Sequence, residues 1–348
     1  MNQTKTEKIS LSGLSEKELI NVAKLNNWPL FKGKQLHSWI YKQWAGSFDE
    51  MTDLNLKERS FLAENYVISP LKLTNKEISK DKTIKYLWKT HDNKFVESVR
   101  MHLEDHDSFS ACISSQVGCA VGCPFCATGK LGLLRNLNAA EIVDQVLSIQ
   151  RDTKERLNNI VLMGQGEPLQ NYDEVIKAIR LIIGSVSIGA RRITLSTSGI
   201  PPKIKKLAHE KLQITLAVSL HAPDQNTREA LVPIARKYKM DELIESLHYY
   251  YNTTKRRITI EYVLLDSIND EINKARALAD LIKDLHCHIN LIPYNQTNDH
   301  IFQRPNNATI QKFKEVLERK SHKKVTIRQE RGNDINAACG QLANVFNG

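Results

Sequence analysis

The sequence contains no apolar run that approaches the ~20 residues of a membrane-spanning helix, and its longest apolar runs have the length of a strand. The first residues, MNQTKTEKIS, are polar and lack the apolar segment of a secretory signal. Low-complexity segments and short-period repeats are also missing. These absences argue against a membrane protein, and we expect a protein of the cytoplasm.

Cysteine is scarce, with six residues in a chain of 348. Three of the six lie in one stretch of eight residues, CAVGCPFC, from Cys119 to Cys126. This is not the pattern of a disulfide-rich secreted domain, and a reducing compartment would keep the thiols free. The clustering therefore favours metal binding or catalysis over structural disulfides.

Acidic residues are the minority among the charged ones. The chain has 39 Asp and Glu against 49 Lys and Arg, which gives a formal net charge of +10, and half of this excess lies in the first 100 residues. Excess basic charge favours polyanionic partners, because neutralised phosphates release counterions. The N-terminal part is therefore the candidate arm for nucleic acid. A basic enzyme with a small-molecule substrate is the alternative.

The length suggests a large core with a smaller appended unit, because single cores stop growing at roughly 250–300 residues. Residues 15–66 space their apolar positions at three and four, and Ser15 and Glu18 predict a capping box at a helix start. Residues 71–99 alternate apolar and polar positions around HDNK, which predicts a hairpin. The predicted domains are a helical accessory domain at 1–70, which is the candidate for contacts with nucleic acid, a β-hairpin linker at 71–104, and a larger core domain at 105–348.

Strand-like and helix-like segments alternate after residue 105. The predicted strands are FSACISS, NNIVLMG, RRITLST, ITLAVSL, RITIEYVLL, HINLIPY and KKVTIRQ. Amphipathic stretches separate most of them, which predicts right-handed βαβ units and a parallel sheet. We therefore expect an α/β fold, a partial β/α barrel whose site lies at the carboxyl ends of the strands.

The cysteine loop admits two kinds of metal centre. A structural zinc site needs a second half with further Cys or His ligands, and none stands near the loop. An iron–sulfur cubane normally takes four thiolates. With only Cys119, Cys123 and Cys126 as ligands, one iron would lack a protein ligand and could bind a substrate.

The spacing Cys-x₃-Cys-x-Phe-Cys, with Phe125 before the last thiol, resembles the signature loop of the radical S-adenosylmethionine (SAM) enzymes. The resemblance implies a [4Fe–4S] cluster on the three cysteines, and SAM bound to the open iron through its amino and carboxylate groups. The segment GQGEP resembles a Gly-Glu-Pro element of the same superfamily. It implies that Gly166 and Glu167 receive the ammonium group of SAM.

Further polar segments follow the other predicted strands. Each residue alone could be an ordinary turn or capping residue. Together they could bind the ribose, carboxylate and adenine of SAM in the mouth of the barrel. The predicted contacts are Ser198, Ser219, Leu220, His221 and Asn295.

The other three cysteines stand apart from the loop. Cys112 precedes it by seven residues, and Cys339 is followed by Gly340 near the C-terminus. The glycine favours a bent loop with the Cys339 thiol turned outward, although a buried thiol is the alternative. Cys287, at the start of a predicted strand, is interpreted as a core residue.

Longer segments of the chain resemble the bacterial RlmN family, the dual-specificity methyltransferases of adenine C2 in 23S ribosomal RNA and transfer RNA. The resemblance runs from about residue 15 to the end, and FKGKQLHSWIYK and FDEMTDLNLKER are similar to the N-terminal accessory domain of that family. The core segments that carry it are CISSQVGCAVGCPFCATGKLG, GQGEPLQNYD, SLHAPDQNTREALVPI, RRITIEYVLLD, INLIPYN and ERGNDINAACGQLA.

This resemblance implies that SAM is used twice. The Cys339 thiolate would take a methyl group, and a 5′-deoxyadenosyl radical would then abstract hydrogen from the S-methyl group. The resulting carbon radical can add to adenine C2, which is too electron-poor to attack a sulfonium methyl directly. Cys112 would release the product through a transient disulfide with Cys339. Glu97 matches the proton acceptor, and a surface strand carboxylate is its alternative.

The resemblance also implies partners: 23S rRNA and tRNA as substrates, an electron donor such as flavodoxin, and a monomeric enzyme. We expect RNA contacts from the N-terminal domain and from Lys130, Arg135, Arg191 and Arg192, unless these residues are simply solvated. Departures from the family pattern bear on fine substrate preference. They are Gln165, Val232, Gln296, Asn333 and Asn336.

Two other functions compete with C2 methylation. The sister family methylates C8 of the same ribosomal adenine and confers antibiotic resistance, but GEPL and PIARKY are more similar to the C2 family. A zinc-dependent RNA-binding protein without catalysis is the alternative from another class.

Overall fold

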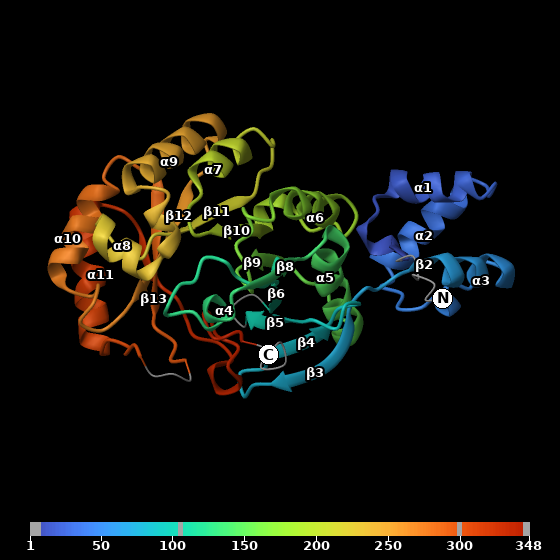
Figure 1. Ribbon diagram of the computed structural model, residues 1–348, viewed down its shortest axis with the longest axis horizontal. Helices are drawn as coiled ribbons and strands as arrows, with labels where there is room; N and C mark the ends of the chain where they lie inside the picture. Colours follow the sequence, from blue (N-terminus) through green and yellow to red (C-terminus); the bar gives the residue numbers. More distant parts are fainter. Residues whose placement is uncertain (1–7, 104–106, 298–300, 344–348) are drawn as a thin grey trace, which may run out of the picture.

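The computed structural model describes residues 8–103, 107–297 and 301–343 (Figure 1). Its main feature is a ten-stranded sheet with the order β14-β13-β12-β11-β10-β9-β6-β5-β4-β3. The predicted domain boundary at residue 104 lies outside the described residues, and the division into three domains stays a prediction.

Seven strands of this sheet run parallel and form the partial barrel. Every strand predicted after residue 105 is formed. The parallel strands are β6 (Ser108–Cys112), β9 (Asn159–Leu162), β10 (Ile193–Thr197), β11 (Thr215–Ser219), β12 (Ile258–Leu264), β13 (Cys287–Pro293) and β14 (Val325–Ile327). Among the described residues, β14 and β3 are the two edges, so the barrel is open as expected.

Helices connect the parallel strands and lie along the outside of the sheet in Figure 1. Asn138 and Asn306 cap the first and last of them with side-chain hydrogen bonds to the third helical residue. The inward faces carry buried aliphatic residues such as Ile179, Leu247 and Leu278. The helices are α5 (Ala139–Thr153), α6 (Tyr172–Gly184), α7 (Pro201–Leu207), α8 (Gln225–Leu231), α9 (Met240–Thr254), α10 (Ile272–Leu281) and α11 (Asn307–Ser321).

Three antiparallel strands extend the sheet beyond β6. They are β3 (Lys72–Ile78), β4 (Ile84–Lys89) and β5 (Phe95–Leu103). The predicted hairpin is confirmed, because β4 and β5 pair from Ile84 with Arg100 to Lys89 with Phe95. Strand β5 then pairs with β6, which places Val99 opposite Cys112. The hairpin therefore belongs to the same sheet as the barrel strands.

The N-terminal helices form a separate group at one end of the molecule (Figure 1). The elements are β1 (Ile9–Ser10), η1 (Leu11–Gly13), α1 (Glu16–Leu25), α2 (Phe31–Tyr41), η2 (Phe48–Glu50), α3 (Leu56–Asn65) and β2 (Tyr66–Val67). The capping box is confirmed: Glu18 accepts the Ser15 amide proton at 2.7 Å, and Ser15 Oγ accepts from the Glu18 amide. Arg151 Nε of α5 donates to the Trp44 carbonyl at 2.7 Å, which ties this group to the barrel.

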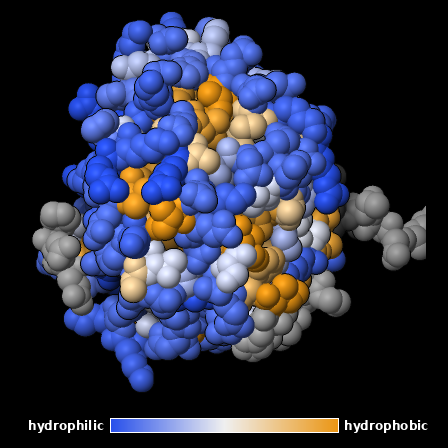
Figure 2. Space-filling view, turned by 90° about the vertical axis from the view of Figure 1, so that its left-hand side faces the viewer, coloured by the Kyte–Doolittle hydropathy of each residue, from blue (hydrophilic) through white to orange (hydrophobic). Residues whose placement is uncertain are grey.

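A small second sheet supports the cysteine loop. It pairs β7 (Gln116–Gly118) with β8 (Leu133–Asn136), and α4 (Ala127–Lys130) follows the loop directly. The remaining short elements are η4 (Ala190–Arg192), η5 (Pro233–Arg236) and η6 (Asn333–Ile335). No helix in the described part of the chain is long and apolar enough to cross a bilayer. The face shown in Figure 2 is mostly hydrophilic, with apolar side chains in separate patches.

Candidate active site

The cysteine loop is shaped by glycine at close backbone contacts. Gly118 has φ +75°, and a Cβ atom there would lie 1.9 Å from the Gly132 carbonyl oxygen. Only glycine therefore lets β7 approach β8 at this point. The Cys119 amide then donates to the Gly132 carbonyl at 2.8 Å, which closes the loop at its base.

All three loop cysteines line one pocket at the carboxyl ends of the barrel strands. Burial raises the pKa of Cys119 to about 12 and moves the pKa of Cys123 and Cys126 in the same direction. Thiols in such surroundings stay protonated unless a cation compensates the thiolate charge. Iron supplies that charge and displaces the protons, so the donor set fits an iron–sulfur cluster.

Glu167 and Ser198, predicted as separate SAM contacts, form a single cluster. Glu167 Oε2 accepts hydrogen bonds from the Ser198 amide at 2.6 Å and from Ser198 Oγ at 2.7 Å. Its Oε1 accepts from Thr197 Oγ1 and from the Leu169 amide. Burial raises the pKa of Glu167, and these four donors oppose that shift. The carboxylate is thus fixed in position on the pocket wall.

Two further features of the pocket suit a bound cofactor. Gly166 has φ +106°, and a Cβ atom there would lie 2.6 Å from the Gln116 side chain, so the backbone itself forms the wall. Asn295 donates through Nδ2 to the Cys339 carbonyl at 3.0 Å, whereas its buried Oδ1 has no partner among the described residues. A buried polar atom without a partner at a pocket indicates a place for a ligand donor.

His221 faces the cysteine loop from the end of β11. Its Nδ1 accepts the Val263 amide proton at 3.0 Å, and burial lowers the pKa of its imidazole to about 3. The ring is therefore neutral and carries its proton on Nε2, where it can donate. Phe125 packs edge-to-face on this ring with 5.1 Å between the centroids. The aromatic residue of the signature loop thus fixes the imidazole.

Arg228 is fully buried beneath these residues, and the motif analysis did not identify it as a functional residue. Its guanidinium donates to the carbonyls of Ser198, Ser219 and Leu220. It therefore holds the ends of β10 and β11 together. The Leu220 side chain is buried and does not line the pocket. A contact between Leu220 and SAM would therefore have to use the backbone of Leu220, and it stays a prediction.

Replacing Arg228 with Ala is expected to lower the free energy of unfolding by about 3 kcal/mol, because two buried carbonyls and one partly buried carbonyl lose their donor. Chemical denaturation of the two proteins measures this difference. The matched control is Arg180→Ala, which removes an exposed ion pair with Glu210 and is expected to cost below about 1 kcal/mol. Equal costs for the two variants would contradict the structural role of Arg228.

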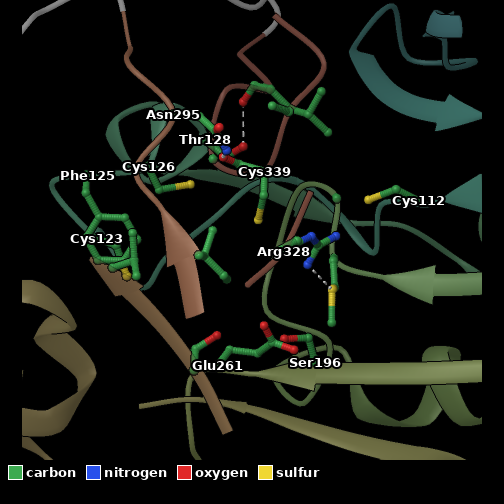
Figure 3. Close-up of a pocket in the computed structure, with 18 of the residues that line it drawn as sticks. Cys112, Cys123, Phe125, Cys126, Thr128, Ser196, Glu261, Asn295, Arg328 and Cys339 are labelled. Atoms are coloured by element: carbon green, nitrogen blue, oxygen red, sulfur yellow. Dashed lines mark hydrogen bonds between the residues drawn. The ribbon is translucent and has the colours of Figure 1, made fainter. Parts of the chain in front are cut away.

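Cys112 and Cys339 line the same pocket as the three loop cysteines. Figure 3 shows the Cys112 sulfur pointing toward Arg328 and the Cys339 sulfur pointing into the pocket. Cys339 is exposed, as the bent loop predicted, and Gly340 has φ +86°. Cys287 is a buried residue of the main core, as expected.

Arg328 lies between the two thiols and was also missed. It follows β14 directly, and its positive charge acts on Cys112, Cys339 and Glu261. Its Nη1 contacts the Met163 sulfur at 3.4 Å (Figure 3). Burial raises the pKa of Cys112 to about 12, and Arg328 opposes this shift. The only feature of the sequence that could have indicated a role for Arg328 is its position at the end of a predicted strand.

The C-terminal segment is held across the pocket by contacts over long sequence distances. Thr128 Oγ1 donates to the Leu342 carbonyl at 2.5 Å, and the Ala127 amide donates to the Gly340 carbonyl at 2.8 Å. Gln341 Nε2 donates to the Gln296 carbonyl at 2.8 Å and to Asn333 Oδ1 at 2.9 Å. Of the departures from the family pattern, Asn333 therefore helps to position the segment that carries Cys339 through its side chain, whereas Gln296 contributes its backbone carbonyl.

The other departures have separate surroundings. Gln165 Oε1 accepts the Glu97 amide proton at 3.4 Å, and Val232 lines the pocket. Asn336 has φ +51° in the loop before Cys339. Glu97 is buried in β5 and does not line the pocket. Met101 lines the pocket, and strand alternation places Glu97 on the same face of β5 as Met101.

The residues predicted to contact RNA differ in their surroundings. Arg135 forms ion pairs with Asp92 and Glu141 at 2.8 Å. Arg191 and Arg192 are exposed just before β10. Their roles toward RNA stay predictions.

The partial barrel and a three-cysteine loop at its carboxyl end define a radical SAM enzyme. The radical SAM superfamily pattern matches residues 113–279, and the pattern described as "Ribosomal RNA large subunit methyltransferase N-terminal domain" matches residues 9–68. A "Probable dual-specificity RNA methyltransferase RlmN" of Alkaliphilus oremlandii is 48% identical over 97% of this chain and 98% of its own length. The chain belongs to the RlmN family of radical SAM RNA methyltransferases.

Two further relatives agree with this assignment. A protein of the same description from Staphylococcus aureus is 46% identical over 90% of this chain and 86% of its own. The crystal structure of a radical SAM methyltransferase from Sphaerobacter thermophilus superposes with a TM-score of 0.92 at 42% identity, covering 96% of this chain and 98% of that one. Family membership settles the metal centre as a [4Fe–4S] cluster used with SAM, and the zinc-binding alternative is wrong.

Proposed function

We propose that this enzyme methylates C2 of a specific adenosine in 23S ribosomal RNA and in transfer RNA. The proposal rests on one observation above the others: Cys112 and Cys339 share a pocket with the three cluster cysteines. A radical enzyme that only cleaves SAM has no need of two further thiols there. The relatives named as dual-specificity RNA methyltransferases support the same substrates.

Three cysteines would hold the cluster: Cys119, Cys123 and Cys126. The residues that would bind SAM are Gly166, Glu167, Ser198, Ser219, Leu220, His221 and Asn295. When bound, the cluster supplies the electron that splits SAM and generates a 5′-deoxyadenosyl radical. The residues of the chain position the reactants for this step. Glu167 presents a fixed carboxylate to the ammonium group, and neutral His221 offers its Nε2 proton.

Cys339 would carry the methyl group that becomes the new carbon on adenine. Its exposure in the pocket allows it to take the methyl group from SAM and later to contact the base. After the S-methyl group has lost a hydrogen atom, its carbon bonds to adenine C2 and the RNA is covalently attached to Cys339. The adenine must leave its stack to reach the pocket, as in other enzymes that modify a base.

Cys112 would release the product. Its thiolate sulfur would bond to the Cys339 sulfur, the bond between that sulfur and the methylene carbon would break, and the carbon would receive a proton to become the methyl group. Addition of the carbon radical to adenine leaves one unpaired electron, and this electron would return to the cluster that supplied it. The Cys112 proton must leave at this step, because burial keeps the pKa of the thiol at about 12. The charge of Arg328 beside Cys112 favours the thiolate form that the exchange requires.

Glu97 is proposed to accept the proton that adenine C2 loses. Burial raises the pKa of its carboxyl to about 7, and only the ionised form accepts a proton. The rate of methylation should therefore rise with pH up to about 7 and then level off. Glu97→Gln is expected to lower the rate by about 100-fold and to remove this dependence.

The neighbours of Glu97 make the test specific. The charge of Glu77 raises the pKa of Glu97 and that of Lys85 lowers it. Glu77→Gln should therefore shift the pH profile of single-turnover methylation to lower pH, and Lys85→Met should shift it to higher pH. Unmoved profiles in both variants would exclude Glu97 as the group that titrates.

The proposal also covers the RNA-binding domain, the electron donor, the oligomeric state and the cellular location. We assign RNA binding to the N-terminal helices, reduction of the cluster to an electron donor such as flavodoxin, and activity to a monomer in the cytoplasm.

The first experiment follows methyl-labelled SAM with the anaerobically reconstituted enzyme, a reductant and a 23S rRNA fragment. The proposal requires label in the RNA and formation of 5′-deoxyadenosine. Reconstituted protein that cleaves SAM but leaves the RNA unlabelled would contradict it.

A further inference from the structure

The inside of the partial barrel is polar instead of being filled with aliphatic side chains. Inward residues of parallel barrels are usually Val, Ile and Leu, which pack into layers. Here Thr194 on β10, Thr259 on β12 and His288 on β13 all line the interior. This leaves a cavity of about 560 Å³ at the amino ends of the strands, opposite the cluster pocket. All of its lining residues except Val161 and Met163 are polar or charged.

A wall of three residues separates this cavity from the reaction pocket. Met163, Glu261 and Arg328 line both. Glu261 is held by Asn290 Nδ2, which donates to Oε2 at 2.9 Å, and Thr326 Oγ1 donates to Asn290 Oδ1 at 3.1 Å. The end of the cavity next to the reaction pocket, here called the deep end, therefore carries one negative group, Glu261, and one positive group, Arg328. Their charges balance.

The mouth of the cavity is different, because three consecutive cations line it. Lys255, Arg256 and Arg257 precede β12, and strand alternation places Arg257 on the same inward face as Thr259 and Glu261. None of the carboxylates in the described residues forms an ion pair with any of the three. Their positive charge is therefore available to a ligand.

The interior just past the mouth offers neutral donors. Burial lowers the pKa of His288, and the charges of Arg257 and Lys324 lower it further, so its imidazole is neutral at pH 7. Thr259 Oγ1 lies 3.4 Å from His288 Nδ1, and Thr215 and Thr194 add hydroxyl groups. Several cations at the rim with neutral donors behind them are the combination that binds phosphate oxygens.

We propose that this cavity is a second ligand site, for a small phosphate-bearing anion such as pyrophosphate or the phosphate chain of a nucleotide. The rim binds the phosphate oxygens, and the threonine hydroxyls and His288 complete their hydrogen bonds. At the deep end the charges of Glu261 and Arg328 balance and add no net attraction, so the anion binds near the cations of the mouth. An RNA strand shares the chemistry, but its backbone continues on both sides of each phosphate, whereas this cavity ends at the wall between the two pockets.

The test is isothermal titration of pyrophosphate into the reconstituted holoenzyme at low salt, without RNA. We expect saturable one-to-one binding. The double variant Lys255→Gln/Arg257→Gln, at two exposed side chains, should weaken it by about tenfold or more. The matched control is Arg191→Gln/Arg192→Gln, which removes the same charge from an exposed arginine pair just before β10 that does not line the cavity. Its affinity should stay within about twofold of the unmodified protein.

Three outcomes would overturn the proposal. Absence of saturable binding would leave no site, and equal weakening in both double variants would reduce the effect to diffuse surface charge. One-for-one displacement of pyrophosphate by an oligoadenylate would assign the cations to the RNA backbone. Thr259→Ile offers a further check, because it removes a hydroxyl donor and narrows the cavity without changing charge, and it should also weaken binding.

Discussion

Cys112→Ala protein is expected to accumulate a covalent complex with its RNA and to complete at most one turnover. In the proposed mechanism the first half of the reaction needs only Cys339, because the methylene carbon on its sulfur forms the bond to adenine. Release would need a second sulfur, and the pairing of β5 with β6 places Cys112 in the same pocket. Without that sulfur the bond between Cys339 and the RNA persists.

Denaturing electrophoresis and intact mass of the complex measure this result. Cys287→Ala is the matched control, since it removes a buried thiol from the main core and leaves the pocket unchanged. It should turn over like the unmodified protein. The double variant Cys112→Ala/Cys339→Ala should form no complex. Normal multiple turnover by Cys112→Ala would remove Cys112 from the mechanism.

Cys339→Ala is expected to abolish methylation, with a loss of four orders of magnitude or more, as is typical when the atom that forms the covalent intermediate is removed (roughly 10⁴–10⁶-fold). The substitution leaves the local backbone intact, because the contact to Asn295 uses the Cys339 carbonyl. The iron content of the protein should therefore stay unchanged. No RNA should become attached.

The comparison with a cluster ligand makes this result interpretable. Cys123→Ala should lose both iron and methylation, whereas Cys339→Ala should lose methylation alone. Iron and sulfide are measured on anaerobically purified protein, and methylation on the same samples. Loss of iron from Cys339→Ala would mean that Cys339 is a fourth cluster ligand, which would contradict the assignment of an open iron.

The fold could be predicted from the sequence because the evidence for it is local. Each parallel strand is a short run of mostly apolar residues, amphipathic helices separate most of the strands, and the structure forms all seven predicted strands. The cysteine loop was equally accessible, because its three ligands lie within eight residues. The spacing of three cysteines within so short a segment largely determines how close their sulfur atoms lie to one another.

The residues that were missed depend on contacts between distant segments. Arg328 acts on Cys112, more than 200 positions earlier in the chain, and no local pattern encodes that approach. Arg228 binds three carbonyls at the ends of two other strands, which its helical surroundings do not reveal. The small sheet of β7 and β8 was missed because its strands are only three and four residues long.

Methylation at C2 of adenine can be measured by nucleoside analysis of cellular RNA. Ribosomal and transfer RNA from a strain that lacks adenosine C2 and C8 methylation would be digested and analysed by mass spectrometry, before and after this enzyme is introduced. We expect 2-methyladenosine to appear in both RNAs and Cys339→Ala to restore it in neither. 8-Methyladenosine in its place, or RNA without any new methylated adenosine, would exclude C2 methylation by this enzyme.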